Sequence, residues 1–209
     1  MTPAAQQGLA ALRDISNFQW TLIPILLLVV YVYAVEMGKE NWKVVLAGLA
    51  FIGMDFFNEI WNGLVFHFTG YAPVWGAPSD SSFIILIGWN IEILLMFMVM
   101  GVAAVKALPQ DKNKKILGVN NRTFYIILNT TCCVAVECVL NAIGALTWDW
   151  PWWSIKFPLF IFLIGYLPFF VVSFWVHDME TDIQRVKTVS AILGFDFACA
   201  AIFGALGWI

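Results

Sequence analysis

Apolar residues run in long stretches along this chain, and short polar segments separate one stretch from the next. Several stretches reach the roughly 17 to 25 residues that a helix needs to cross about 30 Å of hydrocarbon. The pattern therefore predicts membrane-spanning helices. We expect six of them, near residues 20–36, 44–67, 83–107, 123–146, 156–176 and 188–208.

The connections between these stretches are too short to hold a soluble domain. No segment outside the expected spans exceeds about 20 residues, whereas a domain needs roughly 50. The connection 68–82 contains glycine and proline and is expected to be a structured loop, while 108–122 is polar and rich in lysine. The fold class we expect is therefore an all-α integral membrane protein, a single six-helix bundle over residues 1–209.

Composition agrees with a membrane location and limits the partners. Hydrophobic residues make up 61% of the chain and charged residues 12%, against roughly 25% charged residues in a soluble domain. A net charge of -3 leaves no basic surface for phosphates, so we expect no nucleic-acid partner. The bilayer and a lipophilic small molecule are the expected partners, in the cell inner membrane or the endoplasmic reticulum.

The distribution of lysine and arginine predicts the orientation. Nine of these cations fall in the first, third and fifth connections, and only Arg13 and Lys156 fall on the other side. Because cytoplasmic loops carry the excess of lysine and arginine, the odd connections are expected to be cytoplasmic. Both termini are then expected on the non-cytoplasmic side.

Two of the outward connections are rich in tryptophan and proline. They contain the segments 71–75, Tyr-Ala-Pro-Val-Trp, and 148–153, Trp-Asp-Trp-Pro-Trp-Trp. One interpretation is an aromatic belt at the level of the lipid headgroups. The other is a lid or lateral gate above a cavity, and both can hold together.

Ionisable side chains inside the expected spans are the candidates for chemistry. Each costs at least about 2.5 to 3.5 kcal/mol to insert, so its presence points to a function. The chain has five, which are Asp55, Glu59, Glu92, Glu137 and Asp196. At 1.5 Å per residue, Glu59, Glu92 and Glu137 all lie roughly 12 Å below the outer surface. This matched depth predicts one pocket formed by the second, third and fourth spans.

Amides and aromatic rings accompany these acids in the outer half. Candidate substrate-binding residues are Asn58, Asn62, Asn90, Asn141, Trp61, Trp89 and His67. Amides and acids that face one another satisfy hydrogen bonds that lipid cannot, so these faces are expected to look into the bundle. Polar groups that only hold helices together are the structural alternative, but such bonds average about 0.6 kcal/mol and do not require a carboxyl group.

Three close carboxyls in a low dielectric cannot all be ionised, so a neutral acid and a carboxylate are expected together. That pairing supports general acid and base catalysis, and tryptophan faces with carboxylates stabilise a cation. We therefore expect an enzyme that needs no cofactor and isomerises, cyclises or hydrates an isoprenoid, carotenoid or sterol. Glu59, Glu92, Glu137 and Asp55 are the expected catalytic residues.

The segment Met54-Asp-Phe-Phe-Asn-Glu-Ile-Trp-Asn62 resembles acid and tryptophan motifs of small helical membrane terpene cyclases and of emopamil-binding-type sterol isomerases. The resemblance covers one helix, and the order of its residues differs. It implies acid and base chemistry on a lipid and assigns no family.

Two other functions fit parts of the same pattern. Asp196, Asp55 and Glu59 would form a relay of carboxyls in a proton-coupled transporter. Glu59, Glu92 and Glu137, with His67, would be the ligands of a carboxylate metal site, although the Glu-x-x-His element of di-iron bundles is absent from the sequence. We expect no metal.

Overall fold

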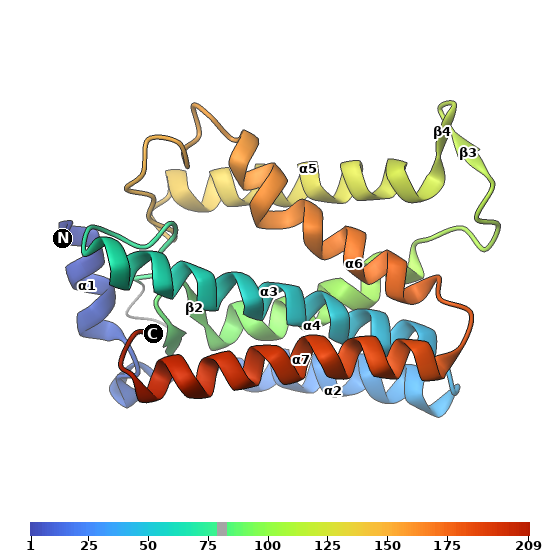
Figure 1. The fold of residues 1–209 in the computed structure, drawn as a ribbon, viewed down its shortest axis with the longest axis horizontal. Helices are drawn as coiled ribbons and strands as arrows, with labels where there is room; N and C mark the ends of the chain where they lie inside the picture. Colours follow the sequence, from blue (N-terminus) through green and yellow to red (C-terminus); the bar gives the residue numbers. More distant parts are fainter. Residues whose placement is uncertain (79–82) are drawn as a thin grey trace.

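The computed structural model describes residues 1–78 and 83–209 and is mainly helical (Figure 1). In chain order the elements are α1 (Pro3–Ala11), the 3₁₀ turn η1 (Ile15–Asn17), α2 (Leu22–Gly38), α3 (Trp42–Thr69), β1 (Ile84–Leu86), β2 (Trp89–Asn90), α4 (Ile91–Lys106), β3 (Lys115–Ile116), β4 (Val119–Asn120), α5 (Asn121–Ala142), the π-helical turn η2 (Ile161–Tyr166), α6 (Leu167–His177) and α7 (Asp182–Ala205). Residues 79–82 of the expected connection 68–82 lie outside the described residues.

Within that part of the chain, three helices are long and apolar enough to cross a membrane, namely α3, α5 and α7. α2 and the segment Ile161–His177 are shorter apolar helices. The all-α fold expected from the sequence is confirmed at this level. Both termini lie at the same end of the bundle (Figure 1).

The third expected span differs from the structure at its beginning. Its first residues form a hairpin, in which β1 pairs with β2 and Ile84 lies opposite Asn90. α4 begins at Ile91, where the Asn90 side chain accepts a hydrogen bond from the Ile93 amide at 2.8 Å and caps the helix. An apolar run such as Ile-Ile-Leu-Ile does not distinguish a short strand from the first turn of a helix.

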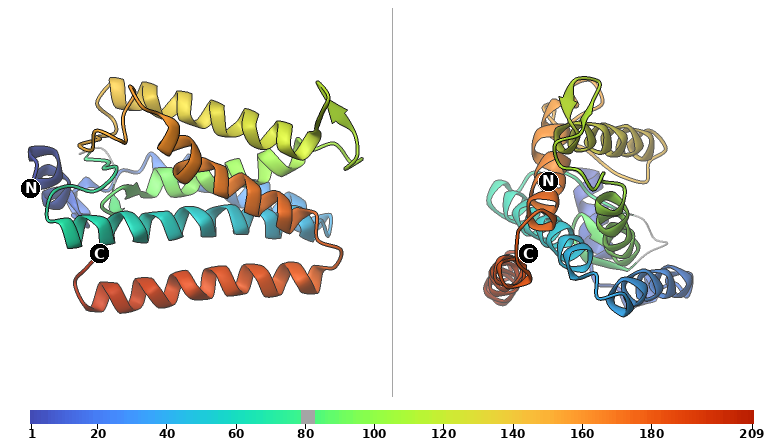
Figure 2. Two further views of the ribbon diagram at one scale, coloured as in Figure 1. Left: turned by 45° about the horizontal axis from the view of Figure 1, so that its top comes forward. Right: turned by 90° about the vertical axis from the view of Figure 1, so that its right-hand side faces the viewer.

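α3 is the central helix of the bundle. It packs against α4, α6 and α7, while α2 packs mainly on α4, and α5 packs on α6 and η2 (Figure 2). Glycine allows a close approach of α4 to α3, because a Cβ atom at Gly101 on α4 would lie 2.8 Å from the Cβ of Phe51 on α3. α5 packs on α6 and α7 packs on α3, so these two helices lie on opposite sides of the bundle (Figure 1).

Three segments close the end of the bundle that holds the termini, which we call the capped end. The hydroxyl of Thr2, at the start of α1, donates to a carboxylate oxygen of Asp149 at 2.6 Å, and its amide donates to the Tyr71 carbonyl. The connections after α3 and after α5 are joined by two backbone hydrogen bonds between Gly76 and Thr147, at 2.9 and 3.0 Å. The N-terminus and both connections thus form one cover.

Ion pairs hold the opposite end, which we call the polar end. Arg122 at the start of α5 donates two hydrogen bonds to the Asp178 carboxylate, at 2.8 and 2.9 Å. Lys106 at the end of α4 donates to Glu36 at the end of α2, at 2.5 Å. Each pair connects the ends of two helices, so the charges at this end fix how the helices meet.

Candidate functional site

A stripe of buried polar residues runs along one face of α3. The stripe begins at Asp55, and Asn58, Glu59 and Asn62 follow it after three, four and seven residues. None of the four is more than 6% exposed. These separations place side chains on the same face of a helix. The stripe therefore lies inside the bundle.

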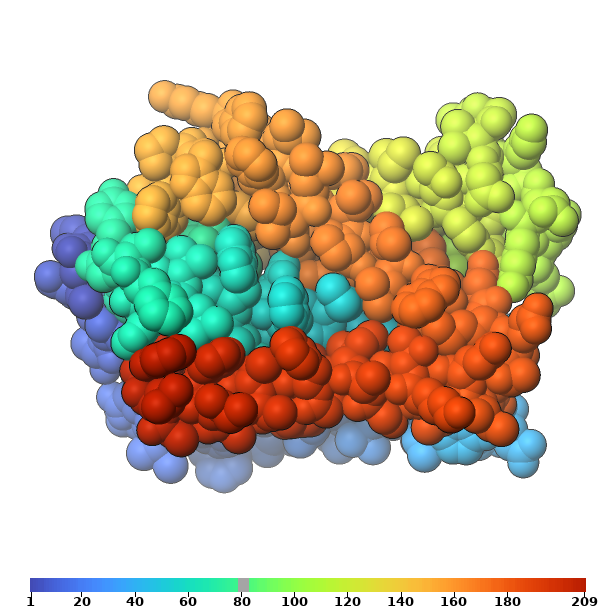
Figure 3. Space-filling model, viewed as in Figure 1, coloured from blue at the N-terminus to red at the C-terminus, as the bar shows by residue number. Residues whose placement is uncertain are grey.

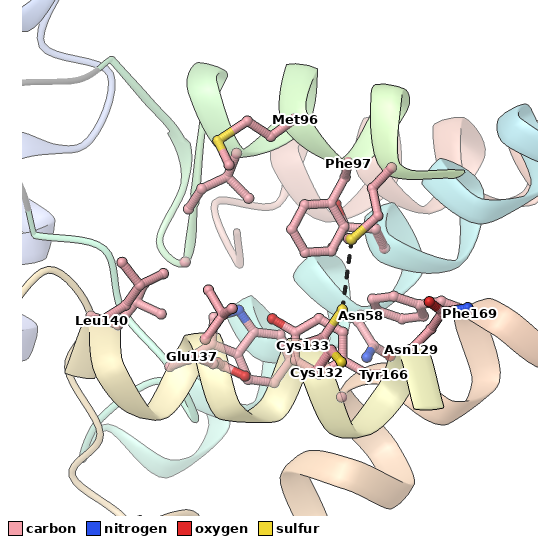
Figure 4. Close-up of a pocket in the computed structure, with 18 of the residues that line it drawn as sticks. Asn58, Met96, Phe97, Asn129, Cys132, Cys133, Glu137, Leu140, Tyr166 and Phe169 are labelled. Carbon is pink, nitrogen blue, oxygen red and sulfur yellow. Dashed lines mark hydrogen bonds between the residues drawn. The ribbon is translucent and has the colours of Figure 1, made fainter. Parts of the chain in front are cut away.

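The first three residues of this stripe line a cavity of about 730 Å³, together with side chains from α4, α5, η2 and α6 (Figure 4). Four carboxyl groups border it, from Asp55, Glu59, Glu92 and Glu137. The structure thus brings together all the acids that the sequence analysis named as catalytic. The volume of the cavity falls in the range of ligand sites, roughly 300 to 1,000 Å³.

One face of α4 and one face of α5 form the long walls. From α4 come Ile93, Met96, Phe97, Met100, Ala103, Ala104 and Ala107, and from α5 come Asn129, Cys132, Cys133, Val136, Glu137 and Leu140. Met96 and Val136 are each 59% exposed, and α5 packs on α6 rather than along α4. The cavity therefore has an apolar mouth on the flank of the bundle, which we call the α4–α5 opening.

Glu59 is held by a tryptophan from the cover of the capped end. The indole N–H of Trp75 donates to Oε1 of Glu59 at 2.8 Å. Asn62 positions this tryptophan, because its Oδ1 accepts from the Val74 amide at 2.7 Å and its Nδ2 donates to the Trp75 carbonyl at 2.8 Å. Asn62 thus acts on the site through Trp75 and does not itself line the cavity.

Two tryptophans of the aromatic connections cover the cavity. Trp75 and Trp153 are 8% and 1% exposed, and their rings stack with centroids 5.1 Å apart. Both line the cavity. At these two positions the aromatic connections form a lid, the second of the two interpretations of the sequence.

Glu137 and Asp55 have aromatic neighbours of their own. Tyr166 lines the same cavity as Glu137 and Asp55, and the indole N–H groups of Trp89 and Trp148 are buried without a hydrogen-bond partner among the described residues. Asp55, Glu59 and Glu137 also lie close enough to influence one another electrostatically. Asp55 and Glu59 from α3 and Glu137 from α5 therefore form one group of acids in the cavity.

Sequence reasoning missed Tyr166, which the π-helical turn η2 carries into the cavity wall. In an α-helix, the amide at position 168 would donate to the Ile164 carbonyl, but Pro168 has no N–H. Nδ2 of Asn58 donates to that carbonyl instead, at 2.9 Å. The sequence signal for this turn was Pro168 inside an apolar run, because a backbone carbonyl that loses its N–H partner in a membrane helix needs another donor.

Several carboxylate oxygens in the cavity have no partner. Among the described residues, Oδ2 of Asp55 and the Oε2 atoms of Glu59, Glu92 and Glu137 are buried and make no hydrogen bond. Buried polar atoms are rarely left unpaired in proteins. Unpaired oxygens on four side chains around one cavity leave these groups free to exchange protons with a bound molecule.

Most of the other predicted site residues lie away from the cavity. The ring of His67 stacks on Trp208 near the C-terminus, 5.3 Å between centroids, and Nδ2 of Asn141 donates to the Leu146 carbonyl at 3.0 Å. Trp61 packs beside Trp75, with ring centroids 5.9 Å apart. Asn90 borders the cavity, but its side-chain oxygen is used to cap α4.

Asp196 lies on the far side of α3 from the other acids. A Cβ atom at Gly53 would be 3.6 Å from Oδ2 of Asp196, so this acid faces Gly53. Gly53 and Asp55 are two residues apart, which is about 200° around a helix. The body of α3 therefore separates Asp196 from Asp55, and the structure does not join them in a relay.

Metal binding was the third possibility that the sequence raised. Over residues 1–78 and 83–209, no three histidine, cysteine, aspartate or glutamate side chains are grouped so that they could hold a metal ion.

Comparison with known proteins gives a membrane family. The model of a family described as "Uncharacterized membrane protein family" matches residues 2–205. A protein of Archaeoglobus fulgidus described as "Uncharacterized protein" is 54% identical over 209 residues, which cover 100% of this chain and 99% of the relative. A second protein of that organism, with the same description, is 57% identical over 53 residues, 25% of this chain and 95% of the relative. No solved structure matches the chain.

Proposed function

The chain belongs to this membrane protein family, and on that premise we propose that it is an enzyme of the bilayer interior. It transfers protons to and from an apolar lipid, an isoprenoid or a sterol, and needs no cofactor. The observation that carries the proposal is the grouping of Asp55, Glu59 and Glu137 in one cavity that opens sideways through apolar residues.

In the proposed reaction, protonated Glu137 gives its proton to one carbon of a substrate double bond. The other carbon becomes a cation, which the faces of Trp75 and Trp153 stabilise. The Glu59 carboxylate, stabilised by the Trp75 N–H, removes a proton from a neighbouring carbon and a new double bond forms. The reaction moves a double bond without net oxidation, and Asp55 passes the proton from Glu59 back to Glu137.

The α4–α5 opening supports entry of the substrate from the bilayer. The cover of the capped end joins α1 to both aromatic connections, so it separates the carboxyls from the water on that side. The exposed side chains Met96 and Val136 at the opening are apolar, as a route for a lipid requires. Exclusion of water also protects a cation from unwanted hydration.

Replacement of single acids by amides tests the proposal. Lipid extracts from cells that make the wild-type protein, Glu59→Gln or Glu137→Gln are compared by mass spectrometry. We expect a lipid that is converted by the wild type and accumulates unconverted in both variants, because acid and base catalysis contributes roughly 10²- to 10⁴-fold. Asp196→Asn is the matched control, an acid replaced by an amide on the far side of α3.

Two outcomes would contradict the enzyme. Identical lipid profiles for the wild type, Glu59→Gln and Glu137→Gln would remove the catalytic role of these acids. Loss of activity in Asp196→Asn as large as in Glu59→Gln, with proton flux in vesicles made from the wild type, would favour the transporter.

We also propose that the chain crosses the membrane six times with both termini on the non-cytoplasmic side, in the cell inner membrane or the endoplasmic reticulum. The cation bias of nine to two supports this orientation, and so does the position of both termini at one end of the bundle. Reporter fusions at each terminus test it, since both must report the same, non-cytoplasmic side. A cytoplasmic signal from either terminus would contradict the topology.

A further inference from the structure

The cavity continues well beyond its carboxyl groups. The lining face of α4 runs from Ile93 to Ala107, which is about 21 Å of helix. Glu59, Glu92 and Glu137 lie toward the capped end. Toward the polar end, α4 and its last residues line the cavity with small or apolar side chains only, namely Met100, Ala103, Ala104 and Ala107. A compact substrate at the carboxyls would leave this second half empty, so the shape favours a long chain.

One polar side chain stands in the second half. Asn129 lies on the same face of α5 as Cys133 and Glu137 and lines the cavity (Figure 4). Its Nδ2 is buried and has no hydrogen-bond partner among the residues that the structure describes. A buried amide without a partner is costly, and it is therefore expected to serve a bound molecule.

The spacing along α5 sets a distance between two points of recognition. Asn129 precedes Glu137 by eight residues, which is about 12 Å along the helix axis. The free group of Asn129 is an N–H donor, so its partner must be an acceptor. Hydroxyl, carbonyl and ether oxygens are the acceptors available on a lipid chain.

We propose that the substrate is an elongated single-chain lipid with an oxygen function that accepts a hydrogen bond from Asn129. Its reacting double bond then lies about 12 Å away, between Glu59 and Glu137. This inference rests on the proposed function for the position of the double bond. Recognition of the oxygen by Asn129 is a separate property, because it concerns binding and not proton transfer.

Binding of two defined probes tests the inference. Geranylgeraniol and the hydrocarbon of the same chain without the hydroxyl group are titrated into the purified full-length protein, and the complexes are counted by native mass spectrometry. We expect the wild type to bind the alcohol roughly 10- to 100-fold more tightly, the difference made by one buried hydrogen bond. In Asn129→Leu we expect this preference to vanish while the affinity for the hydrocarbon stays the same.

Thr131→Val is the matched control, since Thr131 lies on the exposed side of α5 and donates to the Ile127 carbonyl. It should keep the preference for the alcohol. Thermal unfolding adds a second measurement, because an amide that holds helices together would destabilise the protein when replaced. An amide without a partner leaves the midpoint of Asn129→Leu unchanged or raises it.

The inference and the proposed function fail in different ways. Equal binding of both probes by the wild type, or an unchanged preference in Asn129→Leu, overturns the role of Asn129 even if the acids are catalytic. A preference that depends on Asn129, in a protein whose Glu59→Gln and Glu137→Gln variants have unaltered lipid profiles, supports the inference and overturns only the enzyme. Binding of neither probe overturns the inference, and the lipid profiles of the acid variants then decide the proposed function separately.

Discussion

At the scale of single residues, the hydrogen bond from Trp75 to Glu59 is the contact on which the proposed base depends. Its donor comes from the cover, while its acceptor comes from the central helix. Among the described residues, the second carboxylate oxygen of Glu59 has no partner. The indole therefore orients one oxygen and leaves the other for the substrate.

Trp75→Phe is expected to lower lipid conversion by roughly 10- to 100-fold, because a hydrogen bond to a charged group contributes about 1.5 to 3 kcal/mol. The ring remains, so stacking on Trp153 should persist. Trp61→Phe is the control, as Trp61 packs beside Trp75 outside the cavity. Equal conversion by the wild type and Trp75→Phe, measured by mass spectrometry, would show that the indole does not support the base.

Gly88 is required by the crowding around the same tryptophan. A Cβ atom there would lie 2.5 Å from Nδ2 of Asn62 and 2.5 Å from Cδ1 of Trp75. Gly88→Ala is expected to lower the free energy of unfolding by about 1 to 3 kcal/mol, the usual range for overpacking. Gly194→Ala on α7, where nothing lies within 4 Å, should be neutral or stabilising in the same thermal unfolding assay. An unchanged midpoint for Gly88→Ala would contradict the tight contact.

The sequence could identify only those residues that depth in the membrane or spacing along a helix reveals. Depth placed Glu59, Glu92 and Glu137 at one level, and the structure brings them to one cavity. Depth does not tell which face of a helix looks inward across the bundle, so the sequence could not show that the body of α3 separates Asp196 from Asp55 in the expected relay. Asn129 was missed because it lies outside the level at which the candidates were sought.

At the scale of elements, the π-helical turn η2 depends on a donor from another helix. Asn58→Leu leaves the Ile164 carbonyl unpaired and is expected to lower the free energy of unfolding by about 1 to 3 kcal/mol. Pro168→Ala supplies a backbone amide, so the double variant should recover part of this loss. Thermal unfolding of both single variants and the double variant gives the coupling free energy between positions 58 and 168. Strictly additive effects would contradict the shared carbonyl.

The ion pair between Arg122 and Asp178 at the polar end predicts that the stability of the fold depends on pH. Burial alone would raise the pKa of Asp178, but hydrogen bonds from Arg122 and His177 outweigh burial and hold this pKa below its ordinary value of 3.8. The pair therefore stabilises the fold fully above about pH 4, and this stability is lost as the pH falls through the lowered pKa. We expect about 1 kcal/mol, measured as the extra acid sensitivity of the wild type over Asp178→Asn in thermal unfolding. Parallel pH profiles for both proteins would contradict it.

Helical periodicity predicted most elements but not their ends. The expected span 44–67 corresponds to α3, and 123–146 corresponds to α5. The hairpin before α4 and the π-helical turn before α6 were not expected, because both are set by contacts with other segments. A cap at Asn90 and a donor at Asn58 decide them, and hydropathy carries no information on either.

At the scale of the whole molecule, the cover and the opening divide the surroundings of the cavity. α1 and the two aromatic connections lie together at the capped end (Figures 1 and 3), and the flank between α4 and α5 is left open at Met96 and Val136. In the proposed topology this arrangement is closed toward water and open toward lipid, which suits a substrate that never leaves the bilayer. Composition indicated the membrane, but only the packing of α5 on α6 reveals the opening.

The central claim is that the acids of the cavity move protons to and from carbon. The most direct measurement begins with equilibration of the purified protein in deuterium oxide, so that the carboxyl protons of the cavity exchange for deuterium before substrate binds. The protein is then incubated with extracted membrane lipids, which are analysed by mass spectrometry. We predict deuterium in carbon–hydrogen positions of one lipid with the wild type and with Asp196→Asn, and none with Glu59→Gln or Glu137→Gln. Absence of deuterium in every lipid after incubation with the wild type would contradict the account.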